Sequence, residues 1–395
     1  MPGRIEWVIE SCRLLRKIGD QFAASRPFAG TTIGTAIHLE PKTVALLLTL
    51  KRGGATVVST GNLNSTQIEA VDYLRQRGVA VIGEPTRDAG EHDRYLREVL
   101  AARPQLLLDN GGDLLARFVA EPYEGLIGGT EETTSGRIRL TPLREQLARP
   151  VLVVNDSPIK QFAENRHAVG QSVLESLLRI TNRATNGRRI TVFGYGACGK
   201  GVAANLRNAK AIVSVVDVDP VARLEALFDG FLVPERERAL ADADVIVTVT
   251  GAANVVTAAD LPLLKDGVIV MNAGHFPWEI DVAGVEAAAG AVDADEASAI
   301  TTLLLDEGRR VYLLAEGHMV NLAGPRPLGN SIETMDIGFA LQARCLEAVA
   351  TGAVGAESCL VAVPREIDEA VAAAYLDLYA DPDAPPPPPS GPAHR

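Results

Sequence analysis

The apolar residues of this chain recur in short runs, separated by stretches whose apolar positions follow helical spacing. The clearest case begins with an apolar run over 190–193, followed by a glycine-rich turn and a helical pattern over 200–207. A second apolar run over 211–216 then ends in Asp217. Short strands that alternate with helices are typical of a parallel sheet. The pattern therefore predicts, in order, a strand, a turn, a helix, a strand and an acid.

The glycines of this turn have the spacing of a dinucleotide-binding site. Gly194 permits the tight turn, Gly196 lets backbone N–H groups approach a pyrophosphate, and Gly199 lets the helix pack closely on the strand. Asp217 lies where a carboxylate accepts hydrogen bonds from both ribose hydroxyls and repels the 2′-phosphate of NADP. Because the strands, the helix and the acid are in register, the sequence predicts a Rossmann domain that binds NAD.

The same alternation precedes this stretch. The beginning of the chain, up to about residue 30, has the spacing of an amphipathic helix. Strands are predicted over 31–38, 55–59, 79–82, 106–108 and 151–154. Ligands of parallel sheets bind at the carboxyl ends of the strands, so the side chains that follow each strand are the informative ones. They include His38, Asn62, Thr66 and the segment 109–113.

The pattern continues beyond Asp217. Strands are predicted over 245–249, 268–272 and 310–314, and helices over 332–351 and 366–379. The segment 325–330 is rich in proline and glycine and is interpreted as a hinge between domains. The prolines of the last fifteen residues or so predict a disordered tail.

Composition narrows the function classes. A chain of 395 residues favours two or three domains. Its net charge of -12 argues against a nucleic-acid partner and against an anionic membrane surface. The four cysteines are scattered without metal-ligand spacing, so no metal site is expected. The same scatter predicts a location in the reducing cytoplasm. No apolar run is long enough to span a membrane.

Three groups of polar residues are candidates for chemistry. If a helix begins near Ser157, Lys160 and Glu164 share a face, and the carboxylate can tune the lysine as a base; the alternative is a surface ion pair. In the segment 129–136, two adjacent acids are followed by three hydroxyl residues, which suits sugar recognition unless the segment is a solvated turn. His275 follows a predicted strand, where it either reaches the nicotinamide or has a structural role.

Blocks of sequence in these regions resemble S-adenosyl-L-homocysteine hydrolase. The matching blocks, in family order, are LDNGGDL, GTEETTSG, VNDSPIK with ENR, GYGACGKG, VDVDP, NAGHFPWEID, LLAEGHMVNL and IDEAVAAAYL. The resemblance implies a tightly bound NAD between two large domains. It also implies a cycle in which the ribose 3′-hydroxyl is oxidised, the C4′ proton is removed, the C5′ substituent leaves, water adds and the ketone is reduced again.

The resemblance assigns roles to individual residues. It implies catalytic roles for Lys160, Glu132, His38 and His275, and for Glu164, which replaces a family aspartate one methylene shorter. The implied substrate-binding residues are Glu132, Asn165, Asn62 and Thr66. The implied cofactor-binding residues are Gly194, Gly196, Ala197, Cys198, Gly199, Asp217, Thr133, Thr134, Ser135, Thr250, Asn254, Ala273, Gly274, His275 and Asn321.

Other positions depart from the family, and the departures cluster by role. Asn110 replaces an acid near C5′ that is a candidate acid/base, and Val169 replaces a cysteine near the nicotinamide. The segment 325–329 replaces a loop that carries a histidine near the substrate. Around the base, Glu40, Lys42 and Glu333 stand where the family has threonine, glutamate and methionine. The proline-rich residues 381–395 stand in place of an extension that reaches a neighbouring subunit's NAD.

These departures favour a divergent enzyme. The redox residues are kept and those near C5′ are changed, so the sequence predicts elimination at C5′ without re-addition of water. The hypothesis is a nucleoside dehydratase or lyase of specialised metabolism, acting on a small nucleoside that is expected to contain adenine. One alternative is a true S-adenosyl-L-homocysteine hydrolase. Another is a non-catalytic, NAD-binding regulator of such an enzyme.

The predicted architecture is α/β, with a Rossmann domain inserted into a second doubly wound domain. Residues 1–168 form the first part of the substrate domain, 169–326 the NAD domain, 327–380 the return to the substrate domain, and 381–395 the tail. The linkers near Val169 and Pro325 are the candidate hinges. A homodimer or a homotetramer is expected.

Overall fold

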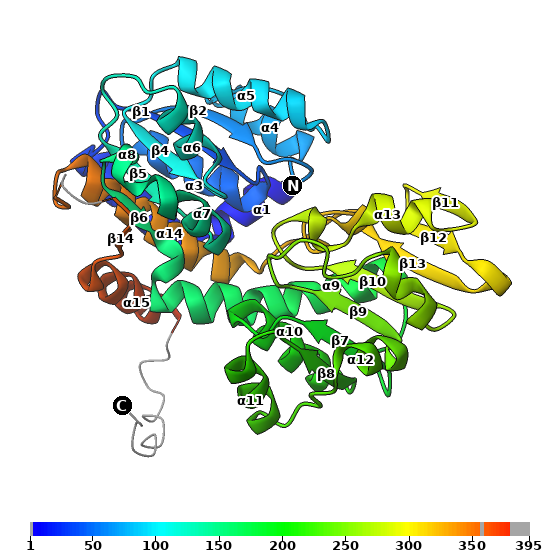
Figure 1. The fold of residues 1–395 in the computed structure, drawn as a ribbon. Helices are drawn as coiled ribbons and strands as arrows, with labels where there is room; N and C mark the ends of the chain where they lie inside the picture. Colours follow the sequence, from blue (N-terminus) through cyan, green and yellow to red (C-terminus); the bar gives the residue numbers. More distant parts are fainter. Residues whose placement is uncertain (1–2, 356–358, 380–395) are drawn as a thin grey trace, which may run out of the picture.

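The computed structural model describes residues 3–355 and 359–379, which form two bodies, each built on a seven-stranded sheet. Figure 1 shows the bodies side by side, one coloured blue to cyan and the other green to yellow. The helix α9 (Val169–Thr181) and the segment that leads into α14 (Ile332–Ala350) run between them. The last residues, including the predicted proline-rich tail at 381–395, lie outside the described part.

The first sheet has the strand order β14-β6-β5-β4-β1-β2-β3. All of its pairings are parallel. Its strands are β1 (Thr32–Ile37), β2 (Thr56–Gly61), β3 (Ala80–Val81), β4 (Leu106–Asp109), β5 (Gly128–Glu131), β6 (Val151–Val153) and β14 (Val361–Ala362). Because β14 comes from the far end of the chain, this sheet takes strands from both sides of the second body.

The second sheet has the order β11-β12-β13-β10-β9-β7-β8. Its strands are β7 (Arg189–Phe193), β8 (Ile212–Val216), β9 (Val245–Thr248), β10 (Val268–Asn272), β11 (Ala291–Asp295), β12 (Ile300–Leu304) and β13 (Arg310–Leu314). The pairings among β7, β8, β9, β10 and β13 are parallel, as a Rossmann domain requires. The fold is therefore the predicted α/β fold.

The helical stretches predicted over 200–207, 332–351 and 366–379 each contain one helix whose ends agree to within a few residues, and the stretch up to about residue 30 contains two helices. The first body carries α1 (Arg4–Ser11), α2 (Arg13–Ser25), α3 (Pro41–Arg52), α4 (Ile68–Gln76), α5 (Ala89–Ala101), α6 (Asp113–Ala120), α7 (Thr134–Leu140), α8 (Arg144–Leu147), α14 and α15 (Arg365–Tyr379). The second carries α9, α10 (Ala197–Asn208), α11 (Pro220–Phe228), α12 (Arg236–Asp242) and α13 (Val282–Ala287).

Two elements differ from the expectation. The antiparallel strands β11 and β12 form an edge that the sequence did not indicate, because β11 is exposed at every position and lacks an apolar run. The polar segment 129–136 is not a loop throughout, since β5 fills its first part and α7 its second. Glycine is required in β5 because a side chain at Gly129 would overlap the backbone of Leu107 in β4.

The two bodies are joined where helices cross at very short range. Lys160–Ala168 forms a π-helix, labelled η3, that runs directly into α9. Against it packs α10, and a side chain at Gly201 would overlap the carbonyl group of Arg166. Gly170 faces the carbonyl group of Gly201 in the same way. These glycines set how closely α10 approaches η3, at the end of the first body, and α9, which continues from it.

A buried carboxylate ties the chain's return segment to its start. Asp336, in α14, accepts hydrogen bonds from the backbone N–H groups of Leu14 (2.7 Å) and Leu15 (2.8 Å) at the beginning of α2. Burial raises the pKa of Asp336 to about 6. The contact satisfies two N–H groups of a helix terminus that has no cap of its own.

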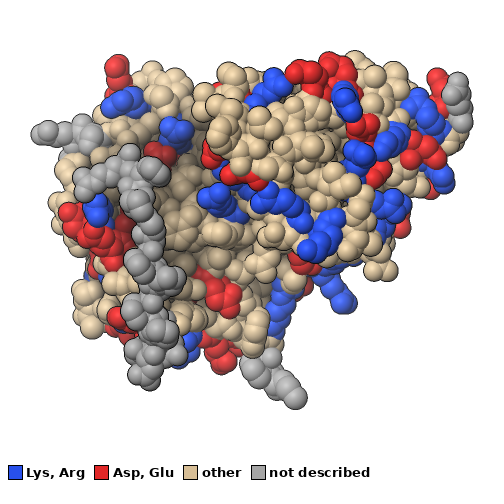
Figure 2. All heavy atoms as spheres, turned by 90° about the horizontal axis from the view of Figure 1, so that it is seen from below, with Lys and Arg blue, Asp and Glu red and all other residues tan. Residues whose placement is uncertain are grey.

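The surface mixes charges. Figure 2 shows the molecule from below, with acidic and basic side chains interspersed among uncharged surface on the visible face. No helix in the described residues is both long and apolar enough to cross a membrane.

We expect Gly201→Ala to destabilise the protein by about 1–3 kcal/mol, because its side chain would overlap backbone that cannot move aside. The measurement is equilibrium urea unfolding. Gly19→Ala, in α2, is the matched control, since its neighbour is the flexible end of Arg52. It should leave stability unchanged or raise it slightly through better helix propensity. Equal stability of the two variants would contradict the proposed close crossing.

Candidate functional site

A cavity of about 450 Å³ lies where the carboxyl ends of the two sheets face each other. Its wall is formed by residues of both bodies, as expected for parallel sheets. Most of the predicted site residues line it: His38, Glu40, Asn110, Glu132, Thr133, Thr134, Ser135, Lys160, Glu164, Asn165, Gly196, Ala197, Cys198, Thr250, Ala273, Gly274, His275 and Asn321.

Several predicted residues lie off the wall of this cavity. Asn62 is behind Asn110, and its side-chain N–H₂ donates to the Asn110 Oδ1 at 3.1 Å. Thr66 is one step further back and donates to the backbone carbonyl of Asn62. Glu333 and Asn254 are exposed to solvent. The residues of α14 that reach the cavity are Met335 and Phe339, so the prediction missed the helix face that points inward.

Other lining residues were not assigned a catalytic, substrate-binding or cofactor-binding role, although Lys42 was expected around the base and Val169 near the nicotinamide. They are Ile37, Lys42, Thr43, Ile138, Asn155, Gln161, Val169, Val249, Gly251, Phe276, Met319, Leu322, Asn330, Met335 and Phe339. Asn155 lies two residues beyond the end of β6, so the strand-end rule applied to the first sheet finds it. The apolar members carry no chemical signal, and only the fold reveals them.

The centre of the cavity is a buried lysine between two buried carboxylates. The Lys160 ammonium forms an ion pair with Glu164 and lies 3.6 Å from the Glu132 Oε1. The other Glu132 oxygen accepts a hydrogen bond from the Asn110 side chain at 2.9 Å. All three charged side chains are less than 10% exposed. The alternative of a surface ion pair is therefore excluded.

The π-helix explains why three polar residues share one face. Lys160 and Glu164 are four residues apart, and Asn165 is five residues beyond Lys160. In a π-helix, residues four and five positions apart both return to nearly the same side, which an α-helix does not allow. Asn165 donates to the Asn155 Oδ1 at 3.1 Å, which also accepts from the Thr134 hydroxyl.

Burial and charge set the protonation of this cluster. Burial raises the pKa of Glu164 to about 7, although Lys160 acts in the opposite direction. Burial lowers the pKa of Lys160, but the Glu164 and Glu132 carboxylates outweigh it, so that the Lys160 pKa is raised. The lysine is therefore held as an ammonium ion, and Glu164 exchanges a proton near neutral pH.

Two histidines from different sheets meet beside the cluster. His38 follows β1 and His275 follows β10, and their ring centroids are 5.9 Å apart. Burial lowers the pKa of His38 to about 3 and the pKa of His275 to about 4, so both imidazoles are neutral at physiological pH. The His38 Nδ1 is 2.5 Å from the Ser65 hydroxyl. Gly111 approaches the His275 Nε2 so closely that a side chain there would crowd the ring.

A second layer of acids holds the loops that carry these groups. Asp109 accepts hydrogen bonds from the backbone N–H groups of Asn110 (3.0 Å) and Leu115 (2.8 Å). Glu131 accepts from the N–H groups of Gly111, Gly112 and Thr133. Burial raises the pKa of Asp109 to about 7 and the pKa of Glu131 to about 8. These acids have no surface in the cavity and serve to position Asn110, Glu132 and Thr133.

The residues on the other side of the cavity fit NAD. The first residues of α10 open into it, and a side chain at Gly196 would meet no protein atom and would project into open space. Asp217 is oriented by the N–H groups of Tyr195 (2.6 Å) and Asp219 (2.9 Å). The Asn321 Oδ1 is buried, and no donor among the described residues reaches it, which suits a carboxamide N–H₂ group.

A buried ion pair lies at the end of the cavity away from the residues that fit NAD. The Lys42 ammonium is 2.8 Å from the Glu40 Oε2 and donates to the Leu328 carbonyl, also at 2.8 Å. Both side chains are about 95% buried. Leu322, Met335 and Phe339 line the same cavity, and they provide apolar surface for a planar group. Leu328 belongs to the proline-rich segment, so this pair also binds that segment to α3.

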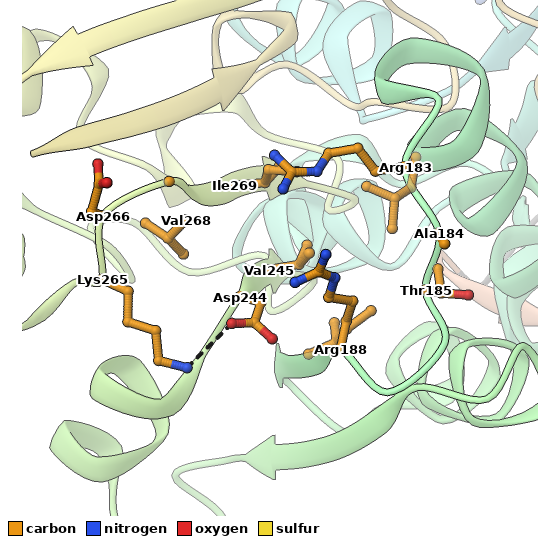
Figure 3. Close-up of a pocket in the computed structure, with 13 residues that line it drawn as sticks. Arg183, Ala184, Thr185, Arg188, Asp244, Val245, Lys265, Asp266, Val268 and Ile269 are labelled. Atoms are coloured by element: carbon orange, nitrogen blue, oxygen red, sulfur yellow. Dashed lines mark hydrogen bonds and ion pairs between the residues drawn. The ribbon is translucent and has the colours of Figure 1, made fainter.

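A smaller hollow of about 120 Å³ lies at the amino ends of β7, β9 and β10 (Figure 3). Arg183 and Arg188 line it, as does the ion pair between Lys265 and Asp244. None of the predicted site residues reaches this hollow. The larger cavity is therefore the candidate active site.

Comparison with known proteins matches both bodies to one family. The family model described as "S-adenosyl-L-homocysteine hydrolase" matches residues 5–124, and that described as "S-adenosyl-L-homocysteine hydrolase, NAD binding domain" matches residues 165–326. An S-inosyl-L-homocysteine hydrolase of Methanopyrus kandleri is 39% identical over 94% of this chain and 89% of the relative. An adenosylhomocysteinase of Aquifex aeolicus is 41% identical over 95% of this chain and 90% of the relative.

These matches cover nearly the whole chain, in the same order as the two bodies described above. The second sheet, with the glycine turn and Asp217, is an NAD-binding Rossmann domain. The chain belongs to the S-adenosyl-L-homocysteine hydrolase family.

Proposed function

We propose that this protein hydrolyses a nucleoside 5′-thioether of homocysteine through transient oxidation of the ribose. The observation that carries the proposal is the Glu132–Lys160–Glu164 cluster, which shares one cavity with the residues that fit NAD. Bound NAD supplies a hydride acceptor for the sugar carbon and returns the hydride at the end of the cycle. The steps below concern the protein's own groups.

Oxidation of a hydroxyl needs an acceptor for its proton. In the proposed pose Glu132 accepts a hydrogen bond from one ribose hydroxyl, while the neighbouring hydroxyl faces Lys160. The hydroxyl proton passes to the Lys160–Glu164 pair, where Glu164 has proton-accepting capacity around neutral pH because burial raises its pKa to about 7. The resulting ketone acidifies the adjacent C4′–H bond.

The neutral histidines supply acid–base groups for C4′ and C5′. In the proposed cycle an imidazole takes the C4′ proton and passes it to the homocysteine thiolate that leaves from C5′. A neutral imidazole then takes a proton from water as the water oxygen adds at C5′, and it returns this proton to C4′. Asn110 cannot carry a proton, but His38 and His275 lie beside its loop. This arrangement supports hydrolysis more than the sequence alone did, because no pattern along the chain indicates that the two histidines meet.

A second candidate is the elimination predicted from the sequence. It is favoured by the Asn110 carboxamide, which is bound to Glu132 and Asn62 and replaces a proton-carrying acid. In this case the C5′ substituent leaves and no water adds. The two candidates share the oxidation step and differ in the product.

The Glu40–Lys42 pair supports a 6-oxopurine base. The resemblance places a glutamate at position 42, and an ionised glutamate only accepts hydrogen bonds. Lys42 only donates them. The atom that it faces must then be an acceptor, and the 6-position carries an acceptor in hypoxanthine but a donor in adenine. Glu40 in turn accepts from the N1–H group that hypoxanthine has and adenine lacks. We therefore propose an inosine-type thioether in place of the adenine nucleoside expected from the sequence.

The first test is mass spectrometry of reactions with S-inosylhomocysteine and S-adenosylhomocysteine in ¹⁸O-labelled water with NAD supplied. We expect inosine that carries the ¹⁸O label, together with homocysteine, and a higher kcat/KM for the inosyl substrate. Glu40→Thr combined with Lys42→Glu should reverse that preference by more than about tenfold in kcat/KM, since unpaired polar groups reject the wrong base. An unlabelled 4′,5′-unsaturated product would establish the elimination, and an unchanged base preference would contradict the assignment of Lys42.

Lys160→Met should lower kcat by about a thousandfold, because the hydroxyl loses the ammonium group that links it to Glu164, the proton acceptor. NAD content should stay at the wild-type level, measured by release on denaturation. Lys17→Met is the control, since Lys17 is exposed and far from the cavity. A Lys160→Met enzyme that still forms NADH with the nucleoside at the wild-type rate would exclude this role.

The pH profile should report Glu164. Its pKa is raised to about 7, and it must be ionised to accept a proton, so kcat/KM should rise with pH through about 7. Glu164→Gln should lower the rate and remove this limb. His38 and His275, with pKa values near 3 and 4, should contribute no limb in this range. A limb retained in Glu164→Gln would assign it to another group.

A further inference from the structure

A glycine in the middle of a long buried helix lies directly against Glu164. Gly338 belongs to α14, whose neighbouring residues Ile337 and Phe339 are buried. Glycine weakens a helix interior relative to alanine, so a glycine here needs a reason. A side chain built at Gly338 would overlap the Glu164 Oε2 and would meet no other residue closely. The space that Gly338 leaves free is therefore filled by the Glu164 carboxylate.

The two oxygens of that carboxylate have different surroundings. One oxygen forms the ion pair with Lys160. The other is buried against α14, and no hydrogen-bond donor among the described residues reaches it. The carboxylate therefore lies between the lysine and the backbone of α14.

The length of the side chain makes this contact specific. The resemblance places an aspartate at position 164, one methylene shorter than the glutamate present here. A longer side chain that starts from the same backbone reaches further towards α14, and the missing side chain of Gly338 provides that space. We propose that Gly338 is a positioning residue whose lack of a side chain sets the reach of Glu164, and thereby keeps the Lys160 ion pair in place for sugar oxidation.

This inference rests on the proposed role of the Lys160–Glu164 pair, and it adds that the side-chain sizes at positions 164 and 338 must match. Glutamate with glycine is one matched combination, and aspartate with alanine is the other. Each single substitution breaks the match, because Gly338→Ala crowds the carboxylate and Glu164→Asp leaves a gap. The double variant restores the fit with a shorter side chain on one element and a longer one on the other.

The experiment is a double-mutant cycle on the rate of NADH formation in a single turnover with the nucleoside substrate. We expect Gly338→Ala and Glu164→Asp each to slow oxidation by about tenfold or more, and the double variant to recover most of that loss. Thermal stability of Gly338→Ala should not fall in proportion, since alanine favours the helix. Gly19→Ala, the same change in α2, should leave the oxidation rate unaltered.

A second readout needs no substrate. The carboxyl band of Glu164, identified by infrared difference against Glu164→Gln, should titrate in the wild-type protein with a midpoint near pH 7. In Gly338→Ala the carboxylate is displaced, and the midpoint should move by at least half a pH unit, while in Gly19→Ala it should not. A wild-type oxidation rate and an unmoved midpoint in Gly338→Ala would overturn the proposal, as would purely additive losses in the double variant. Inactivity of the wild-type protein with every nucleoside would overturn the proposed function instead, and the titration would still decide the role of Gly338.

Discussion

The structure depends on one buried ammonium group. Lys160 is almost fully removed from solvent, and an unpaired charge there would cost several kcal/mol, on the order of what stabilises a whole domain. Glu132 and Glu164 compensate it, but only if both carboxylates are held in place. Several neighbours hold these carboxylates in place. Asn110 donates a hydrogen bond to Glu132, Glu131 binds the backbone of the loop that carries Asn110, and Gly338 leaves space for Glu164.

The cavity around this lysine exists because two parallel sheets turn their carboxyl ends towards each other. Neither sheet holds a complete site, since His38, Glu132 and Lys160 come from the first body and His275 and Asn321 from the second. The first body meets the second where η3 packs on α10 at Gly201, without an intervening side chain. The same crossing therefore serves packing and chemistry.

The two ends of the cavity differ in how far they depart from the family pattern. The centre around Lys160 keeps its charges, and the glutamate that replaces an aspartate at position 164 reaches the space beside Gly338 on another helix. At the end of the cavity proposed for the base, Lys42 places a positive charge where the family has a negative one, and Glu40 adds a carboxylate. The two side chains form a buried ion pair. A buried charge is costly alone, so these two changes stabilise each other.

The sequence by itself determined the alternation of strands and helices, the glycine turn with Asp217, and the polar residues that follow the strands, because these depend on local spacing. Only the tertiary structure decided which of those residues meet. The π-helix turned Asn165 to the same face as Lys160, and the facing sheets brought His38 to His275. Glu333 was left in solvent, while the space beside Gly338 admitted Glu164. Such contacts join residues far apart in the chain, so no local pattern records them.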